Sequence, residues 1–355
     1  MKKFIQLFAI SFLLIFILSG TAFSANEYFR SISTGSWNSN GTWQMSTDAG
    51  NTWIAATKTP TDSSGIITIQ NPNTVTVTVS VNADQLFVNS GGTISINTAV
   101  NLTIKDGSGE DLTVYTGGTI TGTGNLQTQG DAVVLNIRNG ASFNTSLKVN
   151  TGTTSSYNSD YPNPAVCNGT ITADAGATFS VSAGGYFVRA NNTVTNNGII
   201  NGINSTFTMR GASLVNNDSI RPTFFAFDTT TSISGTGINS SANITVGSSG
   251  NISLANNVTF SPSTVMTLIS GGILNPNTRI FNFNSATFRL NSGATVTNSG
   301  TFQTQNTVNL IIKSGSNFNA PLKINTGTAI TYDDGGSYLA KFSGTITVDA
   351  GAVLN

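Results

Sequence analysis

Residues 243 to 330 consist of four consecutive blocks of 22 residues with no gap between them. When the blocks are aligned, four positions are apolar in every block, and each lies in a short run of alternating apolar and polar residues. This period is typical of a solenoid, because a single block cannot bury its apolar side chains except against its neighbours. The apolar columns are Ile244, Met266, Phe288 and Leu310; Val246, Leu268, Leu290 and Ile312; Ile252, Leu274, Val296 and Phe318; and Val258, Ile280, Phe302 and Ile324.

The same pattern extends over residues 65–355 and predicts an all-β parallel solenoid of about twelve coils of roughly 22 residues. Gly dominates a corner position five residues after the first inward residue of each coil, as expected where a repeated corner needs a positive φ or a close backbone approach. We place the first inward residues at Leu86, Leu112, Leu135, Ile171, Tyr186, Phe207, Phe225, Ile244, Met266, Phe288, Leu310 and Ile346. The corner residues are then Gly91, Gly117, Gly140, Gly176, Asn191, Ala212, Thr230, Ser249, Gly271, Gly293, Gly315 and Gly351.

Two steps in this column, from Leu135 to Ile171 and from Leu310 to Ile346, are longer than the others and span 36 residues each. We interpret the additional residues, 156–169 and 331–344, as loops inserted at one coil position. Similar sequences flank both loops: SLKVNTGT and PLKINTGT precede them, and NGTITADAGA and SGTITVDAGA follow them. Two related halves, 175 residues apart, are the simplest explanation. Loops that project from one face of a solenoid often form its binding surface.

The N-terminal residues have the pattern of a secretory signal peptide. Lys2 and Lys3 precede the apolar run 4–18, and the small-residue cleavage site AFS ends at Ser24. Residues 25–64 then lack the coil pattern and contain all three tryptophans. Because the first coil of a solenoid has an open apolar end, we expect this segment to form a cap with Trp37, Trp43 and Trp53 in its core. A tryptophan platform for carbohydrate is the alternative.

The composition excludes several classes of function. Charged residues make up only 8% of the chain, so the surface must consist mainly of Ser, Thr, Asn and Gly. Without Lys2 and Lys3 the net charge is about −2, which argues against a nucleic-acid binder. His is absent, and with it the commonest general base and transition-metal ligand. Cys167 is the single thiol and lies in the first expected loop, where we interpret it as a surface or half-buried residue without special reactivity.

Three acidic motifs are candidates for sites. Asp106, Ser108, Glu110 and Asp111, in the sequence DGSGED, offer hard oxygen ligands for Ca²⁺, although a solvated acidic turn explains the motif better. Asp333 and Asp334 are similarly explained by turn chemistry. Asp174 and Asp349 occupy equivalent positions in TADAGA and TVDAGA, but a distance of about eight coils prevents them from forming a paired-carboxylate active site. We therefore predict no catalytic residues, no cofactor and, apart from this weak Ca²⁺ candidate, no metal.

Residues STGSWNSNGTW, followed by NTVTVTVSVNADQLFVNSGGTISI, resemble the N-terminal part of exported bacterial surface proteins, many of which are secreted by the type IX route. The resemblance implies a right-handed single-stranded parallel β-helix, pectin-lyase-like in shape, and an adhesin or surface-matrix function. Such relatives usually end in a sorting domain. This sequence has none, and its last strand is followed by no cap, so we expect it to be a fragment of a longer chain.

Two functions from different classes remain open. The first is a non-catalytic secreted or cell-surface stalk or adhesin that contacts glycans, partner proteins or a solid surface. The second is a polysaccharide lyase or glycoside hydrolase, which would require acidic and basic side chains clustered on one face. A surface of regular Thr rows that binds ice or mineral is a more distant alternative. Neither a nucleic-acid partner nor a membrane span in the mature chain is expected.

Overall fold

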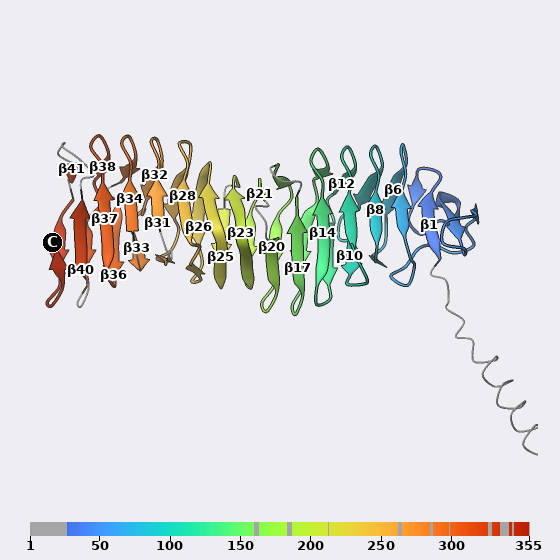
Figure 1. Cartoon of the computed structure of the whole chain (residues 1–355), viewed down its shortest axis with the longest axis horizontal. Helices are drawn as coiled ribbons and strands as arrows, with labels where there is room; N and C mark the ends of the chain where they lie inside the picture. Colours follow the sequence, from blue (N-terminus) through green and yellow to red (C-terminus); the bar gives the residue numbers. More distant parts are fainter. Residues whose placement is uncertain are drawn as a thin grey trace, which may run out of the picture.

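The computed structural model describes residues 27–159, 163–182, 187–211, 213–261, 265–284, 287–297, 299–325, 329–333, 341–342 and 344–354. These residues form stacked parallel coils that build a β-solenoid, and Figure 1 shows the coils side by side along the long axis of the molecule. The solenoid predicted from the repeat is thereby confirmed. Among the described residues, no helix is long and apolar enough to cross a membrane.

Each coil contributes one strand to each of three faces, and every strand pairs in parallel with its counterparts on neighbouring coils. The first face contains β1 (Tyr28–Ser31), β5 (Ile67–Ile69), β8 (Leu86–Val88), β11 (Leu112–Val114), β14 (Val133–Ile137), β17 (Thr154–Asn158), β20 (Thr178–Val181), β27 (Ile238–Asn239), β30 (Val258–Phe260), β33 (Arg279–Asn284), β36 (Gly300–Gln305), β39 (Leu322–Ile324) and β42 (Ile346–Val348). Two long strands, β23 (Ile199–Met209) and β25 (Ser219–Phe227), continue from the first face onto the second.

The second face belongs to the same 30-stranded sheet, whereas the third face is a separate sheet of 13 strands, close to the twelve coils expected. The second face contains β2 (Gly35–Ser36), β6 (Thr74–Val77), β9 (Thr93–Ile96), β12 (Thr119–Gly122), β15 (Ser142–Phe143), β18 (Ala165–Cys167), β21 (Phe187–Ala190), β28 (Asn243–Val246), β31 (Val265–Leu268), β34 (Thr287–Leu290), β37 (Val308–Ile312), β40 (Ala329–Asp333) and β43 (Val353–Leu354). The third face contains β7 (Val81–Ala83), β10 (Asn101–Lys105), β13 (Asn125–Gln129), β16 (Ser146–Val149), β19 (Ile171–Ala173), β22 (Val194–Asn196), β24 (Ser213–Asn216), β26 (Thr230–Ser234), β29 (Asn251–Leu254), β32 (Ile273–Asn275), β35 (Thr295–Val296), β38 (Asn317–Phe318) and β41 (Lys341–Phe342).

Alternation of apolar and polar residues fills the interior, since successive strand residues point to opposite sides of the sheet. The column Val246, Leu268, Leu290 and Ile312 is fully buried and in register from coil to coil, as predicted. Aromatic residues also stack inside the solenoid. One run leads through Phe143, Tyr157, Phe179, Phe207 and Phe225, and a second cluster surrounds Phe302. The core is therefore one continuous apolar column.

One predicted apolar column is wrong in register. Ile280 is 36% exposed, and its neighbour Phe281 points inward and pairs with Val258 and Phe302. The corner before β33 contains two non-Gly residues with positive φ, Asn277 and Thr278. From the inward residue Leu274 to the inward residue Phe281 the chain advances seven residues, whereas the paired residues of the preceding coil, Ile252 and Val258, are six apart. One added residue exchanges the two sides of the following strand. The last residue of this column also differs. Leu322 of β39 pairs with Phe302, whereas Ile324 was expected at that position; Ile324 is buried as well.

The predicted loop insertion at residues 156–169 is also wrong. These residues contribute to β17 and β18, which pair with regular strands on both sides, so Leu135 is followed on its column by Tyr157. Ile171, assigned to the same column, lies instead on the third face beside Leu147. In the second expected insertion, 331–344, β40 and β41 likewise pair with strands of the preceding coil, while 334–340 and 343 lie outside the described residues.

The two related segments lie on different faces of the solenoid. Lys148 of SLKVNTGT is in β16 on the third face, whereas Lys323 of PLKINTGT is in β39 on the first face. Because every strand and corner has the same apolar and polar alternation, a similar sequence can form any of the three faces. The prediction that the two segments share one coil position is therefore wrong.

Glycine corners and asparagine ladders hold neighbouring coils in register. Gly91, Gly117 and Gly140 have φ between 77° and 79°, and the N–H of each of the first two donates to the carbonyl of the next at 3.0 Å. One ladder lies on the outside of the solenoid, where Asn168 Nδ2 donates to Asn144 Oδ1 at 2.7 Å. A second ladder is buried, with Asn196, Asn216 and Asn239 linked through their side-chain amides. Buried amides that pair only in one alignment oppose slippage between coils.

Residues 27–64 cover the N-terminal end of the stack. Their strands pair antiparallel, β1 with β3 (Trp43–Ser46) and β3 with β4 (Ile54–Ala55), and a 3-10 turn (Asn40–Thr42) precedes β3. Trp37 and Trp43 are fully buried, their rings 5.2 Å apart, so they form the core of a cap as predicted. Trp53 differs, because it is only half-buried and the Arg30 guanidinium lies 4.3 Å above its ring.

Cys167 is fully buried in β18, which corrects the expectation of a surface or half-buried thiol in a loop. Its Sγ lies 3.6 Å from the carbonyl of Gly169, and burial raises the pKa of the thiol to about 12. Because the thiolate is the reactive form, we expect a disulfide reagent such as DTNB to leave the folded protein unlabelled at pH 8 and to label one thiol per chain in guanidinium. Rapid labelling under native conditions would contradict this burial.

Candidate functional site

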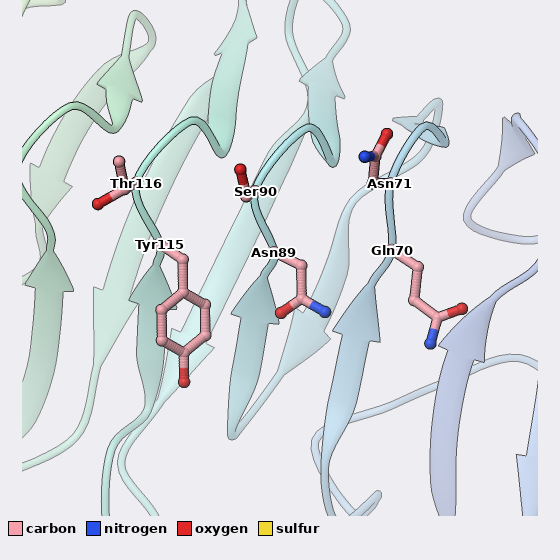
Figure 2. A pocket seen from close by; sticks show the side chains of 6 residues that line it. All are labelled: Gln70, Asn71, Asn89, Ser90, Tyr115 and Thr116. Atoms are coloured by element: carbon pink, nitrogen blue, oxygen red, sulfur yellow. The ribbon is translucent and has the colours of Figure 1, made fainter.

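An open groove of about 690 Å³ lies on the outside of the solenoid, where β5, β8 and β11 end and the chain turns toward the second face. Its walls come from three consecutive coils. Figure 2 shows Gln70, Asn89 and Tyr115 extending to one side of the sheet from neighbouring strands, with the other residues on the corners above them. The lining residues are Gln70, Asn71, Asn89, Ser90, Tyr115 and Thr116.

Strand alternation explains which side chains reach the groove. Leu112 and Val114 of β11 are buried, so Tyr115, the next residue, lies on the opposite side of the strand from Val114 and points outward. The backbone N–H of Tyr115 donates to the carbonyl of Val88 at 2.9 Å, which places Tyr115 beside Asn89. The N–H of Asn89 donates to Ile69 in the same way, so Gln70, Asn89 and Tyr115 form a row along the rod axis.

Glycine keeps the corners beside this row low. Gly117 has φ of 79°, and a Cβ added there would lie 2.8 Å from the hydroxyl oxygen of Ser90. Replacement by any other residue would therefore both strain the corner and crowd the groove. The compact corner leaves Ser90 and Thr116 at the rim and the longer side chains of the row below them (Figure 2).

Tyr115 gives the groove its aromatic surface. It is 41% exposed, and its ring stacks with that of Phe87 at a centroid distance of 6.4 Å and an interplanar angle of 21°. Phe87 lies on the outward side of β8, between the buried Leu86 and Val88. An aromatic ring held by a neighbour and surrounded by amides and hydroxyls can pack against an apolar ligand face while hydrogen bonds fix its orientation.

The groove itself is lined only by uncharged residues. Near it, Arg138 Nη2 and Glu110 Oε1 are 3.8 Å apart, and the hydroxyl of Thr113 donates to the other oxygen of Glu110 at 2.6 Å. Two opposite charges at this separation largely cancel each other for a ligand at the distance of the groove. The electrostatic character of the groove is therefore close to neutral.

Each of the proposed Ca²⁺ ligands interacts with another group of the protein. Asp106 accepts hydrogen bonds from the backbone N–H groups of Asp131 and Ala132 on the next coil, and Ser108 accepts from Gln85. Glu110 is paired with Arg138. In the part of the chain that the structure describes, no group of three or more acidic, Cys or His side chains is placed to hold a metal ion.

Asp111, the last of these candidates, forms a carboxyl pair with Asp84 of the preceding coil. Asp111 is 1% exposed and accepts hydrogen bonds from the backbone N–H groups of Gly107 at 3.0 Å and Val134 at 2.6 Å. Burial and the nearby Asp84 carboxyl raise the pKa of Asp111 to about 6, and burial also raises the pKa of Asp84. One proton shared by two carboxyls replaces a repulsion between two charges.

Because of the carboxyl pair of Asp84 and Asp111, we expect the free energy of unfolding to fall as the pH rises. Because the pKa of Asp111 is raised in the folded state, its contribution is fully present below pH 4 and disappears as the pH passes 6. In Asp84→Asn an amide can donate permanently to Asp111, so we expect the unfolding free energy at pH 7.5 to rise by about 1–2 kcal/mol and its decline above pH 5 to flatten. Thermal unfolding followed by circular dichroism between pH 4.5 and 8 measures this.

Two features make the experiment clear. The chain has no His, so no imidazole titrates in the same range. Asp131→Asn, at an exposed position of the next coil, is the matched control and should leave the decline unchanged. An equal decline in wild type and Asp84→Asn would show that the carboxyl pair does not control the pH dependence.

The two Asp residues of the repeated TADAGA and TVDAGA sequences are ion-paired corner residues. Asp174 lies 3.1 Å from Lys148 Nζ, and Asp349 lies 3.5 Å from Lys323 Nζ, in each case with the lysine on the preceding coil. The two pairs lie on different faces and are not brought together. Asp333 is the last residue of β40, and Asp334 lies outside the described residues.

The groove was missed at the level of sequence, although part of the signal was present. Phe87 and Tyr115 alternate with the inward residues Leu86 and Leu112, so two large aromatic residues at outward positions of adjacent coils could have been recognised. The tryptophans, the alternative carbohydrate platform, do not provide such a surface at Trp37 and Trp43, which are fully buried. Comparison with protein-family models, with curated proteins and with solved structures found no match.

Proposed function

We propose that this chain is an exported, non-catalytic structural protein of the adhesin-like type, which displays a rigid rod at the outer cell surface or in the extracellular space. The leader pattern of residues 1–24 supports export, and the resemblance of residues 33–96 to surface proteins supports display, with the type IX route as the path. A surface of Ser, Thr and Asn with 8% charged residues suits a chain that contacts neutral extracellular polymers.

The observation that carries this proposal is the unbroken stack of coils. Each coil pairs with the next on three faces, and the apolar interior continues from Trp37 in the cap to Phe318 in β38. Because every coil is fixed by its neighbours, such a stack holds its two ends apart and offers a long lateral surface to partners. Length and rigidity are the properties that a stalk or adhesin needs.

Export of the full chain in a Gram-negative host tests the proposal. We expect the protein to appear outside the cytoplasm with a mature N-terminus at Ala25, identified by N-terminal sequencing, and to release neither reducing ends nor unsaturated uronates from a panel of neutral and acidic polysaccharides. Retention in the cytoplasm would contradict export. Release of products would instead favour the polysaccharide lyase or hydrolase.

A further inference from the structure

We infer that the groove of Gln70, Asn89 and Tyr115 binds an uncharged polysaccharide chain lying along the rod axis; this inference names a ligand class and site for the proposed surface protein and rests on that function. The groove offers three features for such a ligand: an exposed aromatic ring, a row of amides in register, and a neutral electrostatic character.

The exposed ring of Tyr115 is the apolar contact. A pyranose ring has a face made of C–H groups, which packs favourably against the electron-rich face of an aromatic ring. Stacking on Phe87 limits the orientations of Tyr115 before a ligand arrives. Less conformational entropy is then lost on binding, so more of the contact energy contributes to affinity.

The amides of Gln70 and Asn89 are the polar contacts. Neither side chain, nor the hydroxyl of Tyr115, hydrogen-bonds to another residue in the described part of the chain, although all three line the groove. Each amide has donors and an acceptor, which matches the neighbouring hydroxyls of a sugar, since a hydroxyl both donates and accepts. These amides and this hydroxyl are therefore available to donate to and accept from the hydroxyls of a ligand.

The register of the row gives the direction of the ligand. Gln70, Asn89 and Tyr115 occupy equivalent positions on successive coils, and strands lie about 4.8 Å apart, so the row extends over about 10 Å along the axis. The spacing of about 4.8 Å between neighbouring strands is close to the length of one sugar unit. A linear chain therefore meets an amide, a second amide and the aromatic ring with successive units, without changing its direction.

The distribution of charge selects an uncharged ligand. No charged residue lines the groove, and Arg138 beside it is paired with Glu110. The carboxyl pair of Asp84 and Asp111 lies at the opposite end of the same strands, before Leu86 and Leu112. A uronate or sulfate polymer finds no positive charge here to offset the desolvation of its anionic groups, so specificity favours neutral chains.

Affinity gel electrophoresis of the full chain measures this binding. The probes are soluble xylan, galactomannan and mixed-linkage β-glucan as neutral polymers, with polygalacturonate and alginate as acidic ones. We expect retardation by at least one neutral polymer, and for Tyr115→Ala a dissociation constant about tenfold higher. The dissociation constant of Tyr115→Phe should stay within about threefold of wild type, because the ring makes the main contact. The double variant Gln70→Ala/Asn89→Ala should raise the dissociation constant by about a few-fold.

Phe224→Ala is the matched control, because Phe224 is an exposed aromatic residue (47%) on a distant coil of the same rod. It should bind like wild type. Equal binding by wild type and Tyr115→Ala would exclude this groove while leaving the proposed surface function intact. Retardation only by the acidic polymers, or by none of the probes, would overturn the ligand class, whereas failure of export would reject the surface function itself. Circular dichroism of each variant shows that loss of binding is not loss of fold.

Discussion

Replacement of Phe302 by Ala is expected to destabilise the C-terminal half of the rod by about 3–5 kcal/mol, the usual cost of truncating a buried Phe. Phe302 is fully buried, and its ring lies 4.8 Å from that of Phe288, 5.1 Å from Phe281 and 5.3 Å from Phe318. These rings belong to different strands and to several coils. A cavity at this position therefore removes contacts between coils as well as within one.

The location of the damage is as informative as its size. A solenoid transmits stability only between neighbouring repeats, so amide hydrogen exchange should accelerate first in β33, β36 and β39 and much less in β8 and β9. Phe302→Leu, which retains much of the volume, should recover most of the stability. Phe224→Ala, at an exposed position, should change it by no more than about 0.5 kcal/mol. Uniform acceleration along the chain would show that the rod unfolds as one unit.

The alternation of residues was sufficient to predict strands and the inward residues within them. At Val246, Leu268, Leu290 and Ile312, each strand is in register with its predecessor, and every step along the chain is 22 residues. Corner glycines were equally predictable, because positive φ at Gly91 or Gly117 leaves few alternatives. Strand alternation and the conformational preference of glycine were therefore sufficient to predict the local structure of strands and corners.

The sequence did not predict which side of a strand faces inward where that depends on the number of residues in the preceding corner. Ile280 and Phe281 are both apolar neighbours in one strand, and only the length of the preceding corner decides which of them points inward. Small errors in corner length add up over several corners. For this reason Ile171 was assigned to the wrong face, and the regular strands β17 and β18 were predicted to be an inserted loop. Three faces with one sequence pattern are indistinguishable until the strands are paired.

The groove was likewise predictable only in part. That Tyr115 points outward follows from its distance to Leu112, so the aromatic residue was predictable. That Gln70 and Asn89 lie beside it was not, because intervals of 19 and 26 residues separate them along the chain, and neither interval equals the period of 22. Only the pairing of β5, β8 and β11 brings the three together.

Replacement of Trp37 by Ala is expected to open the N-terminal end of the rod, with a loss of about 3–5 kcal/mol from the buried ring. The Trp37 ring packs edge-on against Trp43, and its indole N–H donates to the carbonyl of Pro60 at 3.0 Å. Without the indole, this carbonyl loses its partner, which adds about 1 kcal/mol or more if water cannot reach it. The edges of β5 and β6 beneath the cap then become accessible to other chains.

We therefore expect Trp37→Ala to accelerate hydrogen exchange in β5, β6 and β8 before β36 and β37, the reverse of the order for Phe302→Ala, and to increase the fraction of aggregates in size-exclusion chromatography. Trp53→Ala is the matched control. Trp53 is half-buried beneath Arg30, and loss of that cation–π contact should cost no more than about 1 kcal/mol. If both variants behaved alike, the buried pair of Trp37 and Trp43 would not be what closes this end. If Trp37→Ala accelerated exchange equally at both ends, neighbouring coils would be coupled far more strongly than a stack of nearest-neighbour contacts allows.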